Sequence, residues 1–241
     1  MHRFRERRRR ERLRSLTNVL AIRFRGIDPD RFLAGLHERL GWLLQRRFVL
    51  IGILSMLVAL AVAVVRLDEL RRDLPRLGDF LTAENLAVLA IALALVKIVH
   101  ELAHGLACKH FGGECHEMGI LLLVFTPCLY CDVSDVWLLP GKWRRVAVSA
   151  AGMYAELLIA SLCMFVWAAS QPGFLHTLCL NVMLVASINT LLFNGNFLRR
   201  YDGYYIFSDW VEVPNLALRA QLLLRRTLTR VLLGIDEPDD E

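Results

Sequence analysis

The stretch LAVLAIALALVKIVHELAH, residues 86–104, places an H-E-x-x-H motif inside an apolar run. The run belongs to a predicted membrane span of residues 85–108, which exceeds the roughly 20 residues that a transmembrane helix needs. Residues i and i+4 of a helix lie on one face, so His100 and His104 could bind one Zn²⁺. Glu101 between them could act as general base toward an attacking water molecule.

Burial makes a chance occurrence of this motif a poor explanation. A charged side chain at mid-membrane costs about 2.5–3.5 kcal/mol on insertion scales. An intramembrane Glu flanked by two His therefore indicates a functional site. The motif lies toward the C-terminal end of its span, which we expect to stop at Gly112 and Gly113, because paired glycines are poor helix formers.

Three further apolar blocks predict three further spans. They cover residues 48–65, 146–169 and 174–193, and 56% of the 241 residues are hydrophobic, which excludes an ordinary soluble domain. The apolar segment 119–130 is too short to cross, so we expect a re-entrant or β-hairpin segment packed against protein. The charged segment 66–79, with its proline and glycine, is predicted to be a loop. The predicted fold class is an all-α polytopic membrane protein with about four transmembrane helices and a C-terminal interfacial helix.

Charged segments flank these blocks and divide the chain. Residues 1–47 begin with an arginine cluster, which beside membrane spans indicates a basic cytoplasmic region that contacts anionic lipid and no nucleic acid. Residues 48–210 form the predicted membrane-embedded core. Residues 211–241 are predicted to be an amphipathic helix with an acidic tail, and three arginines on one face of that helix fit the inner membrane surface. These are Arg219, Arg226 and Arg230.

The distribution of positive charge orients the chain. Arginine pairs at 46–47 and 199–200 mark cytoplasmic ends of the first and fourth spans. The second span then runs inward, so the H-E-x-x-H motif lies near the cytoplasmic face. The segment after Phe193 ends at the same membrane depth as His104.

Catalytic zinc sites usually take three protein ligands and leave one position open for water. Asp202 is the preferred third ligand, because it follows one apolar span, precedes another apolar stretch and lies at the matching depth. Asp132, Asp135 and His116 remain alternatives on the intervening segment.

The cysteines offer a second candidate site. Cys163 and Cys179 lie in apolar spans and are interpreted as small buried hydrophobic residues. Cys128 and Cys131 form a lone C-x-x-C, and a structural zinc site would normally need a second pair of ligands. The Cys115–His116 pair could supply it, so a second metal or redox role stays open.

These motifs resemble those of the site-2 protease family of intramembrane zinc metalloproteases. That family combines H-E-x-x-H with a later N-x-x-P…D-G element, and Asn194 and Asp202-Gly203 match it, with Phe197 in place of the proline. Met153 likewise replaces the proline of a family A-G-P. The closer likeness is to a bacterial branch of peptide zinc metalloproteases, which shares D-G-Y-Y and the segment 132–137. The resemblance covers roughly residues 27–215.

The resemblance implies a role for each matching residue. His100, His104 and Asp202 would hold Zn²⁺, and Glu101 would take a proton from the water that attacks a peptide carbonyl. Asn194 would bind substrate backbone or stabilise the oxyanion, although a helix C-terminal turn residue is the alternative. The hairpin within residues 113–140 would present an extended substrate strand by edge pairing.

The predicted function is an intramembrane zinc metalloendopeptidase that cleaves a membrane-associated or exported peptide. We expect it in a bacterial inner membrane, with lipid, a peptide or membrane-protein substrate, and export or adaptor proteins as partners. The alternative is a non-proteolytic zinc-binding subunit of an export or efflux assembly, which the missing prolines and short C-terminus favour and Glu101 disfavours. A transporter with a His/Glu relay is weaker, because it leaves Asp202-Gly203 unexplained.

Overall fold

The computed structural model describes residues 21–23, 26, 28–74, 82–123, 126–213 and 216–233. The predicted N-terminal arginine cluster and the acidic tail lie outside the described residues, as do the side chains of Cys128 and Arg226.

Four helices in the described ranges are long and apolar enough to cross a membrane. They are α3 (Arg46–Val65), α6 (Ala83–His110), α7 (Lys142–Ala169) and α8 (Phe174–Ile188) with its π-helical continuation η4 (Asn189–Asn194). On α3, large apolar side chains such as Leu54 and Leu60 are exposed, as expected of a surface that faces lipid. The predicted fold class is confirmed.

Helix α6 ends where its sequence requires. Its last residue is His110, and Gly112 follows with φ of 88°, a left-handed conformation that glycine adopts without steric cost. The amides of Gly112 and Gly113 donate to carbonyls of the last turn of α6. The predicted stop at these two glycines is therefore confirmed.

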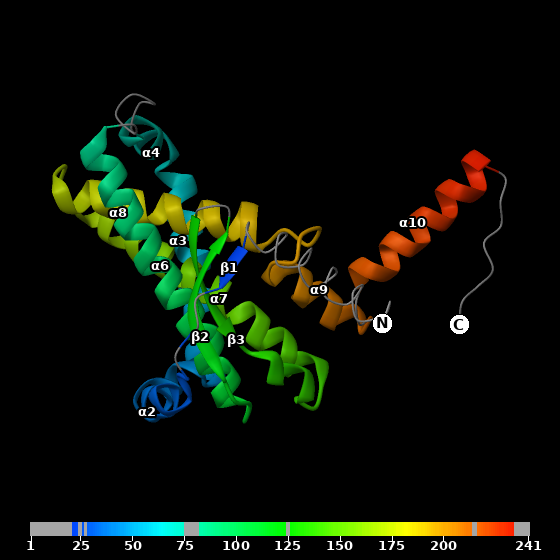
Figure 1. The fold of residues 1–241 in the computed structure, drawn as a ribbon. Helices are drawn as coiled ribbons and strands as arrows, with labels where there is room; N and C mark the ends of the chain where they lie inside the picture. Colours follow the sequence, from blue (N-terminus) through cyan, green and yellow to red (C-terminus); the bar gives the residue numbers. More distant parts are fainter. Residues whose placement is uncertain are drawn as a thin grey trace.

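Helix α7 is the central element of the bundle, and it packs against α3, α6, α8 and α9 (Asp202–Val211). Figure 1 shows α6, α7 and α8 side by side. Trp167, Met164 and Leu180 are almost fully buried between α7 and α8. Because α7 touches both α6 and α9, it can fix the two elements that carry the predicted ligands.

A three-stranded antiparallel sheet lies against α6 (Figure 1). Strands β2 (Glu117–Leu123) and β3 (Thr126–Asp132) form the predicted hairpin. Strand β1 (Ala21–Arg23) pairs with β2 and was not predicted. A three-residue strand is too short to show a periodic pattern, and its partner lies far along the chain.

The remaining elements are short. Helix α2 (Asp30–Leu40) and the 3-10 turn η2 (Gly41–Leu44) precede α3, and the 3-10 turn η3 (Ser134–Leu138) precedes α7. Helix α10 (Leu216–Leu233) is the predicted C-terminal helix, and Figure 1 shows it extending away from the other helices. Its position on a membrane surface stays a prediction.

Residues 66–79 were predicted to be a loop. This prediction was wrong for the residues that form helix α4 (Leu67–Asp73). Acidic Asp68 and Glu69 occupy its first turn, and basic Arg71 and Arg72 its last turn. That order complements the helix dipole and allows pairs three residues apart, such as Arg71 with Asp68. Charge order therefore stabilises a helix that composition alone did not indicate.

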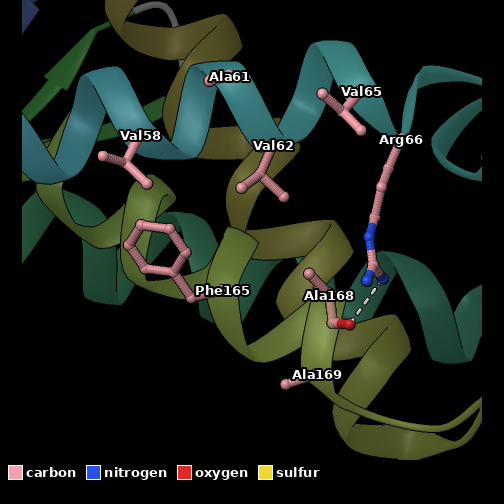
Figure 2. Close-up of a pocket in the computed structure, with 8 residues that line it drawn as sticks. All are labelled: Val58, Ala61, Val62, Val65, Arg66, Phe165, Ala168 and Ala169. Carbon is pink, nitrogen blue, oxygen red and sulfur yellow. Dashed lines mark hydrogen bonds between the residues drawn. The ribbon is translucent and has the colours of Figure 1, made fainter.

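A pocket of about 390 Å³ lies between α3 and α7. Figure 2 shows its apolar lining and, at one end, Arg66, whose guanidinium donates to the carbonyl of Ala168 at 2.7 Å. Ala168 lies about 24 Å along α7 from Gly152, at 1.5 Å per residue. The pocket is therefore separate from the metal centre described next.

Candidate metal centre

Three predicted ligands converge on one point in the structure. His100 and His104 lie one turn apart on α6, and Asp202 is the first residue of α9. The Nε2 atoms of the two His are 3.0 Å apart. Asp202 Oδ2 is 3.0 Å from Nε2 of His100 and 3.4 Å from Nε2 of His104. Both imidazoles are buried, so solvent does not separate the three groups.

The outer nitrogens of both imidazoles face acceptors that are not ligands. His100 Nδ1 is 2.9 Å from Glu156 Oε1, and His104 Nδ1 is 2.8 Å from the carbonyl oxygen of Val148. A carbonyl or carboxylate oxygen only accepts, so each Nδ1 carries the proton and donates. Each Nε2 then presents a lone pair toward Asp202, which is how metal-ligating His residues are commonly oriented.

This arrangement fits a divalent cation. Asp202 Oδ2 is buried and has no hydrogen-bond partner within the part of the chain that is described. The lone pairs of the two Nε2 atoms and the Asp202 carboxylate oxygen face one another, and these three electron-rich groups repel each other unless a cation lies between them. Two His and one Asp form a ligand set that zinc accepts.

Gly152 gives the imidazoles their space. A Cβ atom on Gly152 would lie 2.5 Å from His104 Nε2 and 2.6 Å from His100 Nε2. Real contacts of this kind are not tolerated, so any larger residue would displace the ligands themselves. Gly152 is thus a small residue through which α7 packs directly against the two imidazoles, as small residues allow between membrane helices.

Two contacts place Asp202. A Cβ on Gly203 would lie 2.7 Å from the carbonyl oxygen of Gly195, so the backbone of α9 approaches the preceding turn closely. Farther along α9, the buried Asp209 carboxylate accepts from Arg145 Nε of α7 at 3.0 Å. Together these contacts hold the start of α9 beside α6 without the proline of the family pattern.

Glu101 lies between the two ligands on α6 and is partly buried. It makes no hydrogen bond or ion pair with any residue in the described ranges. Its carboxylate therefore lies beside the two His without another partner in those ranges, and its role as general base stays a prediction.

The sequence reasoning missed Glu156. This residue of α7 is fully buried, and its carboxylate faces His100 on one side and the turn η4 on the other. The signal was a single Glu in an apolar span, since intramembrane acids usually mark functional sites.

Asn194 contacts the supporting residues of the centre. Its side chain is buried, and Nδ2 donates to the Glu156 carboxylate at 3.2 and 3.3 Å. The same nitrogen is 3.4 Å from His100 Nδ1. The predicted role of Asn194 in binding substrate or the oxyanion stays a prediction.

The alternative third ligands lie elsewhere. His116 and Asp135 form a second, exposed cluster with Glu114, in which His116 Nε2 is 3.5 Å from Asp135 Oδ2. Asp132 is the register partner of Glu117 in the hairpin.

Cys131 of the C-x-x-C motif lies against a cysteine of the Cys115–His116 pair that the sequence offered as a second pair. Cys131 Sγ is 3.0 Å from Cys115 Sγ. A hydrogen bond to Cys131 lowers the pKa of the Cys115 thiol, and the same hydrogen bond raises the pKa of Cys131. A second metal or redox role for this pair stays a prediction.

Two buried His on a helix long and apolar enough to span a membrane, with Asp202 at the start of α9, form a candidate metal centre. The model of Peptidase family M50 matches residues 88–237, and the chain belongs to that family, as the resemblance to site-2 proteases predicted. Family membership and the four apolar helices make the chain an integral membrane protein. Its assignment to a bacterial branch stays a prediction.

One curated relative is the uncharacterized protein MJ0971 of Methanocaldococcus jannaschii. It is 40% identical over 70 residues, which are 29% of this chain and 19% of the relative. The match thus spans about a fifth of that protein's length. No solved structure gave a significant match.

Proposed function

We propose that this chain is an intramembrane zinc metalloendopeptidase that hydrolyses peptide bonds of a membrane-associated or exported peptide. Membership of Peptidase family M50 supports the general class. The observation that carries the proposal is the convergence of His100 Nε2, His104 Nε2 and Asp202 Oδ2, with a free carboxylate beside them.

His100, His104 and Asp202 would hold Zn²⁺, which when bound polarises a carbonyl oxygen and acidifies water. Glu101 would accept a proton from the attacking water and return it to the leaving amine. Its lack of other partners in the described ranges leaves both oxygens free for that transfer. The apolar surroundings limit access of bulk water, which strengthens the electrostatic interactions inside the site.

The sheet offers a way to hold an extended substrate. Strand β3 is an edge of the described sheet and packs against α6, which carries the motif. A substrate strand added to an edge gains main-chain hydrogen bonds without a requirement for one sequence. This supports a peptide in extended conformation as the substrate.

The proposed location is a bacterial inner membrane with the N-terminus in the cytoplasm. Basic pairs at 46–47 and 199–200 support this orientation. Lipid and an export or adaptor protein are the proposed partners.

Replacing Glu101 by Gln tests the mechanism. The full chain, purified in detergent, should keep its zinc content and lose cleavage of membrane peptides, because the amide cannot accept the proton. Glu114→Gln, an acid of the exposed cluster, is the matched control and should cleave normally. Cleavage retained by Glu101→Gln would sink the mechanism.

A non-proteolytic zinc-binding subunit of an export or efflux assembly is the second candidate. One contact favours it: the side-chain nitrogen of Asn194, the predicted substrate or oxyanion donor, already donates to the Glu156 carboxylate. The two functions separate if the wild-type chain binds zinc and cleaves none of the candidate membrane peptides.

A further inference from the structure

We propose that Glu156 is a positioning residue for the metal centre. Its carboxylate holds the Nδ1 proton of His100, which directs Nε2 of that imidazole toward the cation, and it ties the turn η4 to α6. The inference rests on the proposed zinc site, and it does not depend on whether that site cleaves peptides.

The Glu156 side chain is shielded from solvent. Glu156 lies within a predicted membrane span and is fully buried. An unpaired charge in that environment is strongly unfavourable, so the partners of this carboxylate determine its role. Lys97 Nζ, one turn before the motif on α6, lies 3.4 Å from Glu156 Oε1 and supplies a positive charge.

The partners of the Glu156 carboxylate are hydrogen-bond donors. Besides Lys97 and His100, the carboxylate faces three side chains of η4. Asn189 donates at 2.6 Å, Asn194 donates to both oxygens, and the Thr190 hydroxyl donates to Oε2. Asn189 and Asn194 thus present donors, as does Thr190, and Glu156 is the acceptor that they share.

The proton of His100 follows from this. His100 Nδ1 faces Glu156 Oε1 at 2.9 Å and the donor nitrogen of Asn194 at 3.4 Å. Only the carboxylate can accept, so Nδ1 must donate to it. Carboxylates that hold metal-binding His residues in this way fix the ring and raise its basicity.

The turn η4 that Glu156 contacts is π-helical. The amide of Gly195 donates to the carbonyl of Thr190, five residues earlier, which is the hydrogen bond of a π turn. This turn carries the three Glu156 partners and immediately precedes the segment that leads to Asp202. Glu156 therefore joins one ligand directly and supports the approach of another.

The test measures zinc affinity by competition with a chromophoric chelator, using the full chain stripped of metal in detergent. Glu156→Ala should weaken binding about 10- to 100-fold, as expected for loss of a residue that orients a ligand. Glu156→Gln should restore part of the affinity, because its amide oxygen can accept from His100. Ser161→Ala, a buried polar residue of the same helix away from the centre, should bind as wild type.

A second measurement separates positioning from general stability. The ¹⁵N shifts of His100 in the metal-free chain report which ring nitrogen carries the proton. Wild type should show the proton on Nδ1, and Glu156→Gln, which preserves side-chain size, should show a larger share on Nε2. Wild-type affinity in folded Glu156→Gln together with an unchanged proton position would overturn the proposal. Glu156-dependent zinc binding without any cleavage would support it and contradict the proposed protease.

Discussion

Among the described residues, two clusters bring three metal-ligand side chains within reach of one cation, and they differ in burial and in how their imidazoles are held. The buried cluster consists of His100, His104 and Asp202, and the exposed cluster consists of Glu114, His116 and Asp135. In both, the ligand atoms lie within 4.8 Å of one another. His100 is only 3% exposed, whereas the side chain of His116 is 61% exposed.

The difference shows that proximity alone does not make a metal centre. In the buried cluster, separate acceptors hold the Nδ1 proton of each imidazole, so each Nε2 is fixed toward the third ligand. In the exposed cluster, the Nε2 of His116 faces Asp135, and water competes for both side chains. Exposed ion pairs of this kind contribute little free energy, so they do not hold a side chain in one position. We therefore expect tight zinc binding at the buried cluster alone.

Removal of a ligand should have the largest effect. Asp202→Ala takes away the carboxylate on which both imidazoles converge, so zinc affinity should fall by more than about 100-fold, beyond the loss of a supporting residue. Zinc content of the purified chain measures this. Unchanged zinc content would mean that the exposed cluster, and not the buried one, binds the zinc.

Gly152→Ala should come next, because its methyl group would occupy the space of the two imidazoles. Overpacking of this kind typically costs about 1–3 kcal/mol, which corresponds to roughly 5- to 150-fold in zinc affinity. Chelator competition gives the value. Gly35→Ala is the matched control, since a Cβ there meets nothing within 4 Å.

Gly203→Ala should have a smaller effect. The added methyl group would press on the backbone of Gly195, so the strain would fall on the turn before Asp202 and not on the imidazoles themselves. We expect about a tenfold weaker affinity, at the low end for a supporting residue, with zinc content near wild type. A value equal to that of Asp202→Ala would mean that the whole helix, and not one carboxylate, is displaced.

Changes in the exposed cluster should have the smallest effect. Asp135→Asn removes a charge that contacts only His116 among the ion pairs of described residues, so tight zinc binding should change by less than about twofold. Titration with zinc beyond one equivalent would detect any weak second site. A loss of the tight site in this variant would contradict the distinction between the two clusters.

Much of this arrangement could be predicted because a bilayer imposes simple rules. Span length follows from membrane thickness, which predicted all four membrane helices. Depth in the membrane then led from the H-E-x-x-H motif to Asp202, on a distant segment. The short apolar segment could only be a hairpin or a re-entrant loop, and it is a hairpin.

The missed features depend on partners that a linear pattern does not show. Strand β1 forms by pairing with the edge of β2, a partner far along the chain. Helix α4 is stabilised by acidic residues in its first turn and basic residues in its last turn. Glu156 could have been noticed as an acid in a span. Its connection to His100 and to η4 depends on how three helices pack, and sequence spacing does not encode that.

The position of the ligands also bears on how the chain is made. Asp202 is synthesised long after His104, with the hairpin and two membrane helices between them. A nascent chain that has inserted only α6 offers a cation two imidazoles, and the third ligand arrives when α9 docks on α7. Cation binding would thus stabilise the docked position of α9 late in the biogenesis of the chain. Cells starved of zinc should therefore accumulate chains whose C-terminal segment is sensitive to proteolysis.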